Sequence, residues 1–234
     1  MAWNRTNQAR RLLAIPLIQY VEDKMALERR NILLLGVGLA AASVTSAFAG
    51  VTASHRNNLF GIRSLGNPKA GKKIIEYFSL GCPHCAEFAT HTLKPKIVPS
   101  LIDTGKLYYV FRDFPLDGVS LMAAQVARAL PAHDYFPFIE ILFSHQLEWA
   151  YAPKLKTKRD YENALFKYAA LAGMSRNRFD AAIADKKLSN FILAERRKAE
   201  QKYHVDATPT FIFDDKKYPG AMDFKQFSAM IGEG

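Results

Sequence analysis

The sequence predicts an α/β fold, in which a small sheet lies between helices and a helical insertion occupies about residues 118–190. Two cysteines, Cys82 and Cys85, stand between a strand-like run and a helix-like segment. An apolar fraction of 49% and a charged fraction of 23% match an ordinary globular domain that is long enough to form its own core. Three apolar, strand-like runs bracket a long stretch of helical periodicity, at 73–80, 107–111 and 210–214.

Residues 1–49 are predicted to be an N-terminal extension followed by a secretory signal peptide. Arg29 and Arg30 precede a short apolar run, and small residues then end in an A-x-A pattern at Ala49. A positive flank, an apolar stretch and such a site are typical of a signal peptide. We therefore expect cleavage after Ala49 and a mature domain at 50–234.

Three alternatives accompany this prediction. The apolar run is short and rich in alanine and glycine, which disfavours a membrane span, but an uncleaved signal would anchor the protein in the membrane. The paired arginines also suit the twin-arginine export route. Met25 is an alternative start of translation, and residues 1–24 are expected to lack folded structure.

The first half of the mature chain is expected to alternate strands with one helix. Glu76 is the exception in an otherwise apolar, β-branched and aromatic strand. The helix should bend near Pro95, because proline lacks the N–H that the helix needs. After a polar lead-in, the predicted elements are a short strand, a turn, a buried strand, the helix and a further strand, at 59–63, 66–68, 73–80, 84–102 and 107–111.

The second half is expected to be helical until its last quarter. Apolar residues recur three and four positions apart in five segments, at 120–130, 135–149, 161–172, 176–184 and 188–203. A strand, a second short strand and a final helix follow, at 210–214, 217–218 and 223–231. The order β, β, α, β, helices, β, β, α predicts a thioredoxin-like fold, in which the helical subdomain is inserted into the core.

The spacing of the cysteines predicts redox chemistry. A Cys-x-x-Cys pair at the start of a helix is typical of thioredoxin-type redox proteins. Unpaired N–H groups and a partial positive charge at a helix N-terminus stabilise the Cys82 thiolate, which is the nucleophilic form of cysteine. Cys85 is placed to attack Cys82 once a mixed disulfide has formed. Such a pair needs no cofactor, and none is expected.

The net charge and the motifs of the chain also bear on three other possible functions. The net charge is +10, but no basic cluster is interleaved with stacking aromatics, so nucleic-acid binding is not predicted. A zinc site formed by Cys82, Cys85 and a histidine such as His91 is an alternative, although a structural zinc site normally has a second ligand pair. A holdase with a vestigial motif is a further alternative, in which Cys82→Ala would leave activity intact.

Three segments resemble the DsbA-type family of exported thiol:disulfide oxidoreductases, and its alphaproteobacterial members in particular. They are EYFSLGCPHC at 76–85, VFRDFPL at 110–116 and ATPTF at 207–211, and the resemblance spans about residues 59–231. The chain departs from the pattern in two ways. The insertion lacks the extra cysteines of some relatives, and Thr208 replaces valine before the proline.

The resemblance implies roles for individual residues. Cys82 would be the attacked, solvent-facing sulfur, and His84 would donate a hydrogen bond or positive charge to its thiolate unless it is only a surface residue. Pro209 would follow a cis peptide bond that aims the backbone of Thr208 at an extended substrate, whereas a trans proline at a strand start is the alternative.

Glu76 and the aromatic residues near Cys82 complete the candidate site. A buried carboxylate is costly unless it is partnered or protonated. Glu76 is therefore interpreted as a proton relay for Cys85, or else as a residue that reaches water or pairs with Lys73 or another base. Phe78, Leu80, Phe88 and the aromatic residues of the insertion are expected to form an apolar surface for unfolded substrates.

The predicted function is an exported, periplasmic dithiol oxidase that introduces disulfides into secreted proteins. Its partners would be unfolded or reduced secreted proteins and, by the resemblance, a quinone-linked membrane oxidase of DsbB type. A monomer is expected. A disulfide isomerase or reductase of the same fold is the main alternative, and the redox potential separates them.

Overall fold

The computed structural model describes residues 59–233, so the predicted signal peptide, its cleavage site and the lead-in at 51–58 lie outside the described residues. Within that range the strands form one five-stranded sheet in the order β1-β3-β2-β4-β5. Strands β2 and β3 are parallel, and the other neighbouring pairs are antiparallel. The strands are β1 (Arg63–Leu65), β2 (Lys72–Phe78), β3 (Leu107–Asp113), β4 (Thr210–Phe213) and β5 (Lys216–Pro219).

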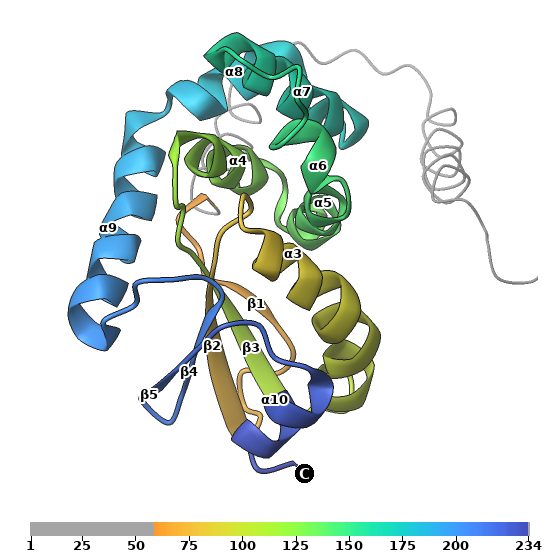
Figure 1. Cartoon of the computed structure of the whole chain (residues 1–234), viewed down its shortest axis with the longest axis vertical. Helices are drawn as coiled ribbons and strands as arrows, with labels where there is room; N and C mark the ends of the chain where they lie inside the picture. Colours follow the sequence, from red (N-terminus) through yellow and green to blue (C-terminus); the bar gives the residue numbers. More distant parts are fainter. Residues whose placement is uncertain (1–58, 234) are drawn as a thin grey trace, which may run out of the picture. The chain divides into compact units, whose positions relative to one another are not determined.

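Helices cover the sheet and fill the long connection between β3 and β4 (Figure 1). Helix α3 (Pro83–Phe88) continues into the π-helix η1 (Ala89–Ile102). The connection holds six helices, namely α4 (Gly118–Ala129), α5 (Ala132–Ser144), α6 (Gln146–Trp149), α7 (Lys158–Leu171), α8 (Arg176–Ala184) and α9 (Lys186–Tyr203). Helix α10 (Phe224–Met230) ends the fold. The predicted α/β class with inserted helices is confirmed.

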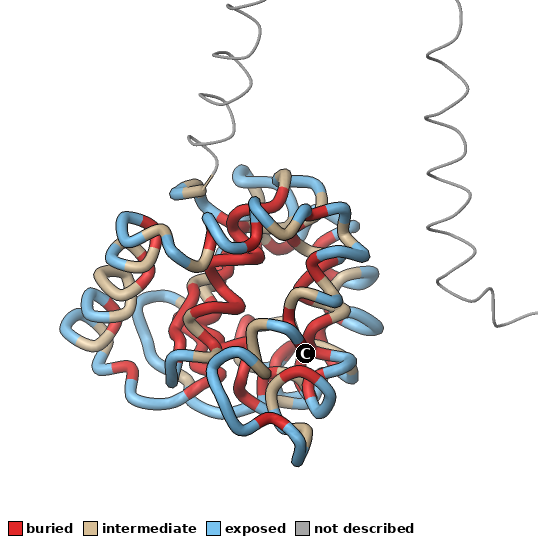
Figure 2. The backbone as a smooth tube through the Cα atoms, turned by 90° about the horizontal axis from the view of Figure 1, so that it is seen from above, coloured by how far each residue is buried: buried red, intermediate tan, exposed pale blue. Residues whose placement is uncertain are grey.

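Successive side chains of β2 point to opposite faces of the sheet, so the strand contributes to two separate parts of the core. Ile74, Glu76 and Phe78 are buried on the face that packs against α3, η1 and α10. Ile75 and Tyr77 belong to a smaller cluster on the other face, which includes residues of α9. Figure 2 shows buried residues concentrated in the interior, with exposed ones around them. The strand that precedes the cysteines is therefore covered on both faces.

Several element boundaries differ from the sequence prediction. The first strand lies at Arg63–Leu65 rather than at 59–63, and the helix expected at 135–149 divides into α5 and α6 because His145 leaves the helical region of backbone space. Helix winding changes at Ala89, well before Pro95. Prolines within η1 cannot donate to the usual carbonyl four residues back, which removes bonds of the α-helical ladder. Helix α9 runs without a break across residue 190, the expected end of the insertion.

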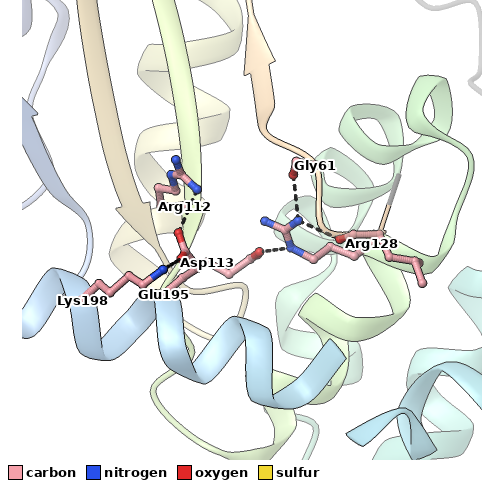
Figure 3. Close-up of polar contacts among 7 residues, drawn as sticks. Gly61, Arg112, Asp113, Arg128, Glu195 and Lys198 are labelled. Atoms are coloured by element: carbon pink, nitrogen blue, oxygen red, sulfur yellow. Dashed lines mark hydrogen bonds and ion pairs between the residues drawn. The ribbon is translucent and has the colours of Figure 1, made fainter. Parts of the chain in front are cut away.

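The end of β3 is fixed by two ion pairs on opposite sides (Figure 3). Arg112 contacts Glu195 of α9 at 3.0 Å, while Asp113 accepts a hydrogen bond of 2.5 Å from Arg128 of α4. The second pair is buried, and Arg128 also donates to the carbonyl of Gly61. Since β3 runs beside β2, these contacts fix the part of the sheet from which the cysteine segment starts.

Candidate active site

The two cysteines lie at the junction of β2 and α3. Cys82 occupies the N-cap of α3 with extended backbone geometry, and Pro83 is the first helical residue. Proline fits there because its missing N–H would have no helical partner. The Cys82 carbonyl accepts the first helical bond from the N–H of Ala86 at 3.1 Å. Both cysteines are free thiols, so the structure shows the reduced pair.

The environment of Cys82 favours its thiolate. The thiol of Cys85 donates a hydrogen bond to Cys82, and this is the largest cause that lowers the pKa of the Cys82 thiol to about 5. Thr208 and the backbone N–H groups of Cys85 and His84 lower the pKa further, against the opposing effect of burial. An anion at the start of a helix is stabilised by such donors. Cys82 is therefore largely ionised at neutral pH.

Cys85 is affected in the opposite direction. Burial raises the pKa of its thiol well above the ordinary value, and the bond that it donates to Cys82 and the charge of Glu76 add to the rise. The Cys85 thiol is fully buried in the core. At neutral pH the pair thus consists of one thiolate and one thiol, which is the asymmetry that thiol–disulfide exchange requires of an attacked and a leaving sulfur.

The expectation that Cys82 faces solvent is wrong for this reduced state. Only 5% of the residue is exposed, because its sulfur lies 3.2 Å from the carbonyl oxygen of Thr208, in the segment before β4. The protonated thiol donates a hydrogen bond to this carbonyl, and the thiolate does not. The Thr208–Pro209 peptide bond is cis, as the resemblance implied. The hydroxyl of Thr208 is buried without a hydrogen-bond partner, and a thiolate at Cys82 can accept the bond that this hydroxyl has to give.

The side chain of His84 does not lie where the sequence analysis expected it. Its imidazole is 74% exposed and lies 3.6 Å from the carboxylate of Glu87, one turn along α3. Only the backbone N–H of His84 contributes to the low pKa of the Cys82 thiol. An exposed side chain at a helix start has several open rotamers, so the residue's place between the cysteines does not fix its direction.

Glu76 is buried beneath the cysteines and bonded to a tyrosine. It is 3% exposed, and the hydroxyl of Tyr109 donates to its carboxyl group at 2.8 Å. Burial raises the pKa of Glu76 to about 8, the Tyr109 bond lowers it, and the charge of Cys82 raises it again. The alternative in which Glu76 reaches water or pairs with Lys73 is therefore wrong. The carboxyl group is a protonated acid at neutral pH, coupled electrostatically to both cysteines.

The expected apolar surface of Phe78, Leu80 and Phe88 is also wrong, because all three side chains belong to the core. Aromatic and apolar residues in a strand and on the inner side of a helix pack inward, since that removes the most surface from water. The insertion, whose aromatic residues were also expected there, carries exposed apolar side chains on the segment that bonds to residues 80–82. Leu147 is 76% exposed and Tyr151 is 48% exposed.

Three residues that contact the site were not predicted from the sequence. Tyr109 bonds to Glu76, Gln146 donates to the carbonyls of Leu80 and Cys82, and Tyr151 donates to the carbonyl between them. The sequence did contain a signal for them, namely a tyrosine in an apolar strand and a polar side chain among apolar helices. Such polar groups need hydrogen-bond partners when they are buried.

No metal site and no membrane-spanning helix is found within the described range. Among residues 59–233 there is no group of three or more metal-ligating side chains that could hold an ion. His91 instead lies with its Nδ1 atom 3.1 Å from the carbonyl of Glu87. In the same part of the chain, no helix is both long enough and apolar enough to cross a bilayer.

Comparisons with known proteins agree with the fold. A sequence profile described as thioredoxin matches residues 61–233. The crystal structure of alpha-DsbA1 from Wolbachia pipientis is 33% identical, covers 74% of this chain and 90% of its own, and has a TM-score of 0.65. BdbD from Bacillus subtilis, at 20% identity and a TM-score of 0.61 over 74% of this chain and 91% of its own, shows likeness of fold alone.

A relative from Rickettsia typhi carries the provisional name protein-disulfide oxidoreductase. It is 30% identical over 148 residues, which are 63% of this chain and 52% of the relative. The chain thus spans about half the length of the curated relatives it matches.

Proposed function

We propose that this chain, which belongs to the thioredoxin family and to its DsbA-type members, is an exported dithiol oxidase that introduces disulfide bonds into secreted proteins. The observation that carries the proposal is the unequal pair of sulfurs. The pKa of the Cys82 thiol is lowered to about 5, while that of the Cys85 thiol is raised. A reduced state that is stabilised in this way makes the disulfide a strong oxidant, because oxidation of a substrate returns the enzyme to its stable form.

The reaction transfers two electrons from substrate to enzyme. A substrate thiolate attacks Cys82 in the disulfide, the Cys82–Cys85 bond breaks, and Cys85 leaves with the electron pair. A second substrate thiolate attacks the substrate sulfur of the mixed disulfide, and Cys82 leaves as a thiolate. The substrate gains one disulfide, and the enzyme is left with the thiolate of Cys82 and a sulfur at Cys85 that needs a proton.

Glu76 supplies that proton in the proposed cycle. Its carboxyl group retains the proton at neutral pH because its pKa is about 8, and its charge is coupled to that of Cys85. A buried acid with a pKa near the working pH can give and take back a proton with little driving force lost. Tyr109 orients the acid by its bond of 2.8 Å.

The remaining parts of the proposal rest on the sequence. The segment before Ala49 supports export to the periplasm through a signal peptide. Reduced or unfolded secreted proteins are the proposed substrates. A quinone-linked membrane oxidase of DsbB type is the proposed acceptor of the two electrons, and the resemblance to the DsbA-type family supports it.

The test is the redox equilibrium of the purified protein with glutathione, together with oxidation of a reduced, unfolded substrate. We expect the Cys82–Cys85 couple to oxidise glutathione, and we expect Cys82→Ala to abolish substrate oxidation. A couple near that of thioredoxin, about −270 mV, would overturn the oxidase and favour a reductase. Reactivation of a scrambled substrate without net oxidation would favour an isomerase.

A further inference from the structure

The backbone carbonyls of three consecutive residues, Leu80, Gly81 and Cys82, all accept hydrogen bonds from side chains of the insertion. Gln146 of α6 donates from Nε2 to the carbonyls of Leu80 at 2.6 Å and of Cys82 at 3.1 Å. The hydroxyl of Tyr151, just after α6, donates to the carbonyl of Gly81. Residues 80–82, here called the active-site turn, are thus held by a six-residue segment that lies more than 60 positions away in the chain.

The geometry of the turn depends on these donors. The turn lies between Ser79, the first residue after β2, and the start of α3 at Pro83, so the carbonyls of Leu80 and Gly81 are outside any strand or helix. Buried carbonyls without partners are costly, and Gln146 is itself buried. Helix α4 adds a steric constraint, because a Cβ atom on Gly81 would lie 3.2 Å from the Cβ of Ser120. The insertion therefore leaves the turn little freedom.

We propose that Gln146 and Tyr151 are positioning residues that hold the active-site turn in the geometry that keeps the Cys82 sulfur beside its hydrogen-bond donors at the start of α3. The inference rests on the proposed function only in taking Cys82 as the reacting sulfur. Because Cys82 is the N-cap of α3, any change in the turn moves its sulfur relative to the N–H groups at the start of the helix, which stabilise the thiolate. The insertion would in this way help to set the redox balance of the pair.

Two further observations support this assignment. Burial raises the pKa of the Tyr151 phenol, and the charges of Asp117 and Cys82 add to the rise, so the phenol and the sulfur are electrostatically coupled. The segment that holds the turn also carries the exposed side chain of Leu147 and the half-exposed ring of Tyr151. The same short segment thus bonds to the active-site turn and exposes apolar side chains to solvent.

The experiment compares Tyr151→Phe and Gln146→Met with the wild type in two measurements. The first is titration of the Cys82 thiolate by its ultraviolet absorbance, and the second is the redox equilibrium with glutathione. Loss of one net hydrogen bond is expected to weaken the oxidising equilibrium by about 2- to 10-fold and to raise the thiolate midpoint by about 0.3 to 1 pH unit. A merely structural role would change the unfolding midpoint and leave both of these values in place.

Matched controls are available within the same insertion. Tyr168→Phe removes a hydroxyl that bonds to Glu148, and Gln125→Met removes a buried amide that donates to the carbonyls of Ala182 and Asp185. The inference is overturned if Tyr151→Phe and Gln146→Met shift the thiolate midpoint no more than these controls do. If Gln146→Met does not fold, Tyr151→Phe alone decides, because it removes one hydroxyl from a half-exposed ring. A wild-type couple that fails to oxidise glutathione would contradict the proposed function, while the titration would still test the inference.

Discussion

Replacement of Glu76 by glutamine should change how the stability of the reduced protein depends on pH. The ordinary pKa of the carboxyl group is 4.5, and burial raises it to about 8 in the folded state. Between these values the folded protein keeps a proton that the unfolded chain has lost. The contribution of Glu76 is therefore fully present below about pH 4.5 and is lost as the pH rises through 8.

The magnitude follows from the gap between the two pKa values. Each tenfold change in proton affinity corresponds to about 1.4 kcal/mol, so the gap from 4.5 to about 8 amounts to about 5 kcal/mol above pH 8. At pH 7 the loss is about 3 kcal/mol. Glutamine has nearly the same shape and cannot ionise. The variant should match the wild type near pH 4.5 and be more stable than it by these amounts at higher pH.

Cys82 contributes with the opposite sign. The pKa of its thiol falls from the ordinary 9.0 to about 5 in the folded state. Its contribution is present above pH 9 and is lost as the pH falls through 5, so the wild type's own profile is flattened by two opposing trends. The difference between the wild type and Glu76→Gln at each pH removes the Cys82 contribution, apart from the coupling between the two groups.

The assay is denaturant unfolding of both proteins, kept reduced, across the range from pH 5 to 9. Glu87→Gln is the matched control, because this glutamate lies on α3 near the cysteines but is exposed to solvent. Its difference from the wild type should stay small at every pH. A difference for Glu76→Gln that is the same at pH 5 and pH 9 would refute the assignment of Glu76 as a buried acid with a raised pKa.

Three further outcomes are expected. The thiolate absorbance of Cys82 should titrate with a midpoint near 5. Cys85→Ala should move this midpoint upward, because it removes the largest stabilising donor. An unmoved midpoint would mean that other groups stabilise the thiolate. Asp113→Asn should cost about 3–5 kcal/mol in denaturant unfolding, because it leaves the Arg128 charge buried without its carboxylate. Glu195→Gln, which breaks the more exposed pair with Arg112, should cost under about 1 kcal/mol, and equal costs for the two variants would contradict the difference in burial.

The parts of the site that follow from local sequence were predictable. A strand with apolar alternation, a cysteine at the helix N-cap and a proline after it are set by residues within one turn of each other. Glu76 was visible as a carboxylate among apolar neighbours, and its burial follows from sharing a face with Ile74 and Phe78. These features depend on residues that are close together in the sequence, so the spacing of apolar residues was enough to predict them.

The partners of these residues were not predictable from the same patterns. Tyr109 meets Glu76 because β2 and β3 pair in a register that sequence does not display. Gln146 and Tyr151 lie on the insertion, and Thr208 is 126 positions from Cys82. The burial of Cys82 depends on the last of these contacts, which is why solvent exposure was expected and was wrong.

Burial raises the pKa of both thiols and is the largest cause of the rise at Cys85, so the opposite shift at Cys82 is due to hydrogen bonds that outweigh its burial. Several donors stabilise the Cys82 sulfur, and the strongest of them is the thiol of Cys85. The same bond raises the pKa of the Cys85 thiol, so each sulfur's shift is partly the cause of the other's. In the disulfide neither sulfur carries a proton, so the hydrogen bond between the two sulfurs cannot form. The free energy that separates the two redox states therefore resides mainly in the reduced pair, and substitutions around the thiolate should change the redox equilibrium more than those that contact only the closed disulfide.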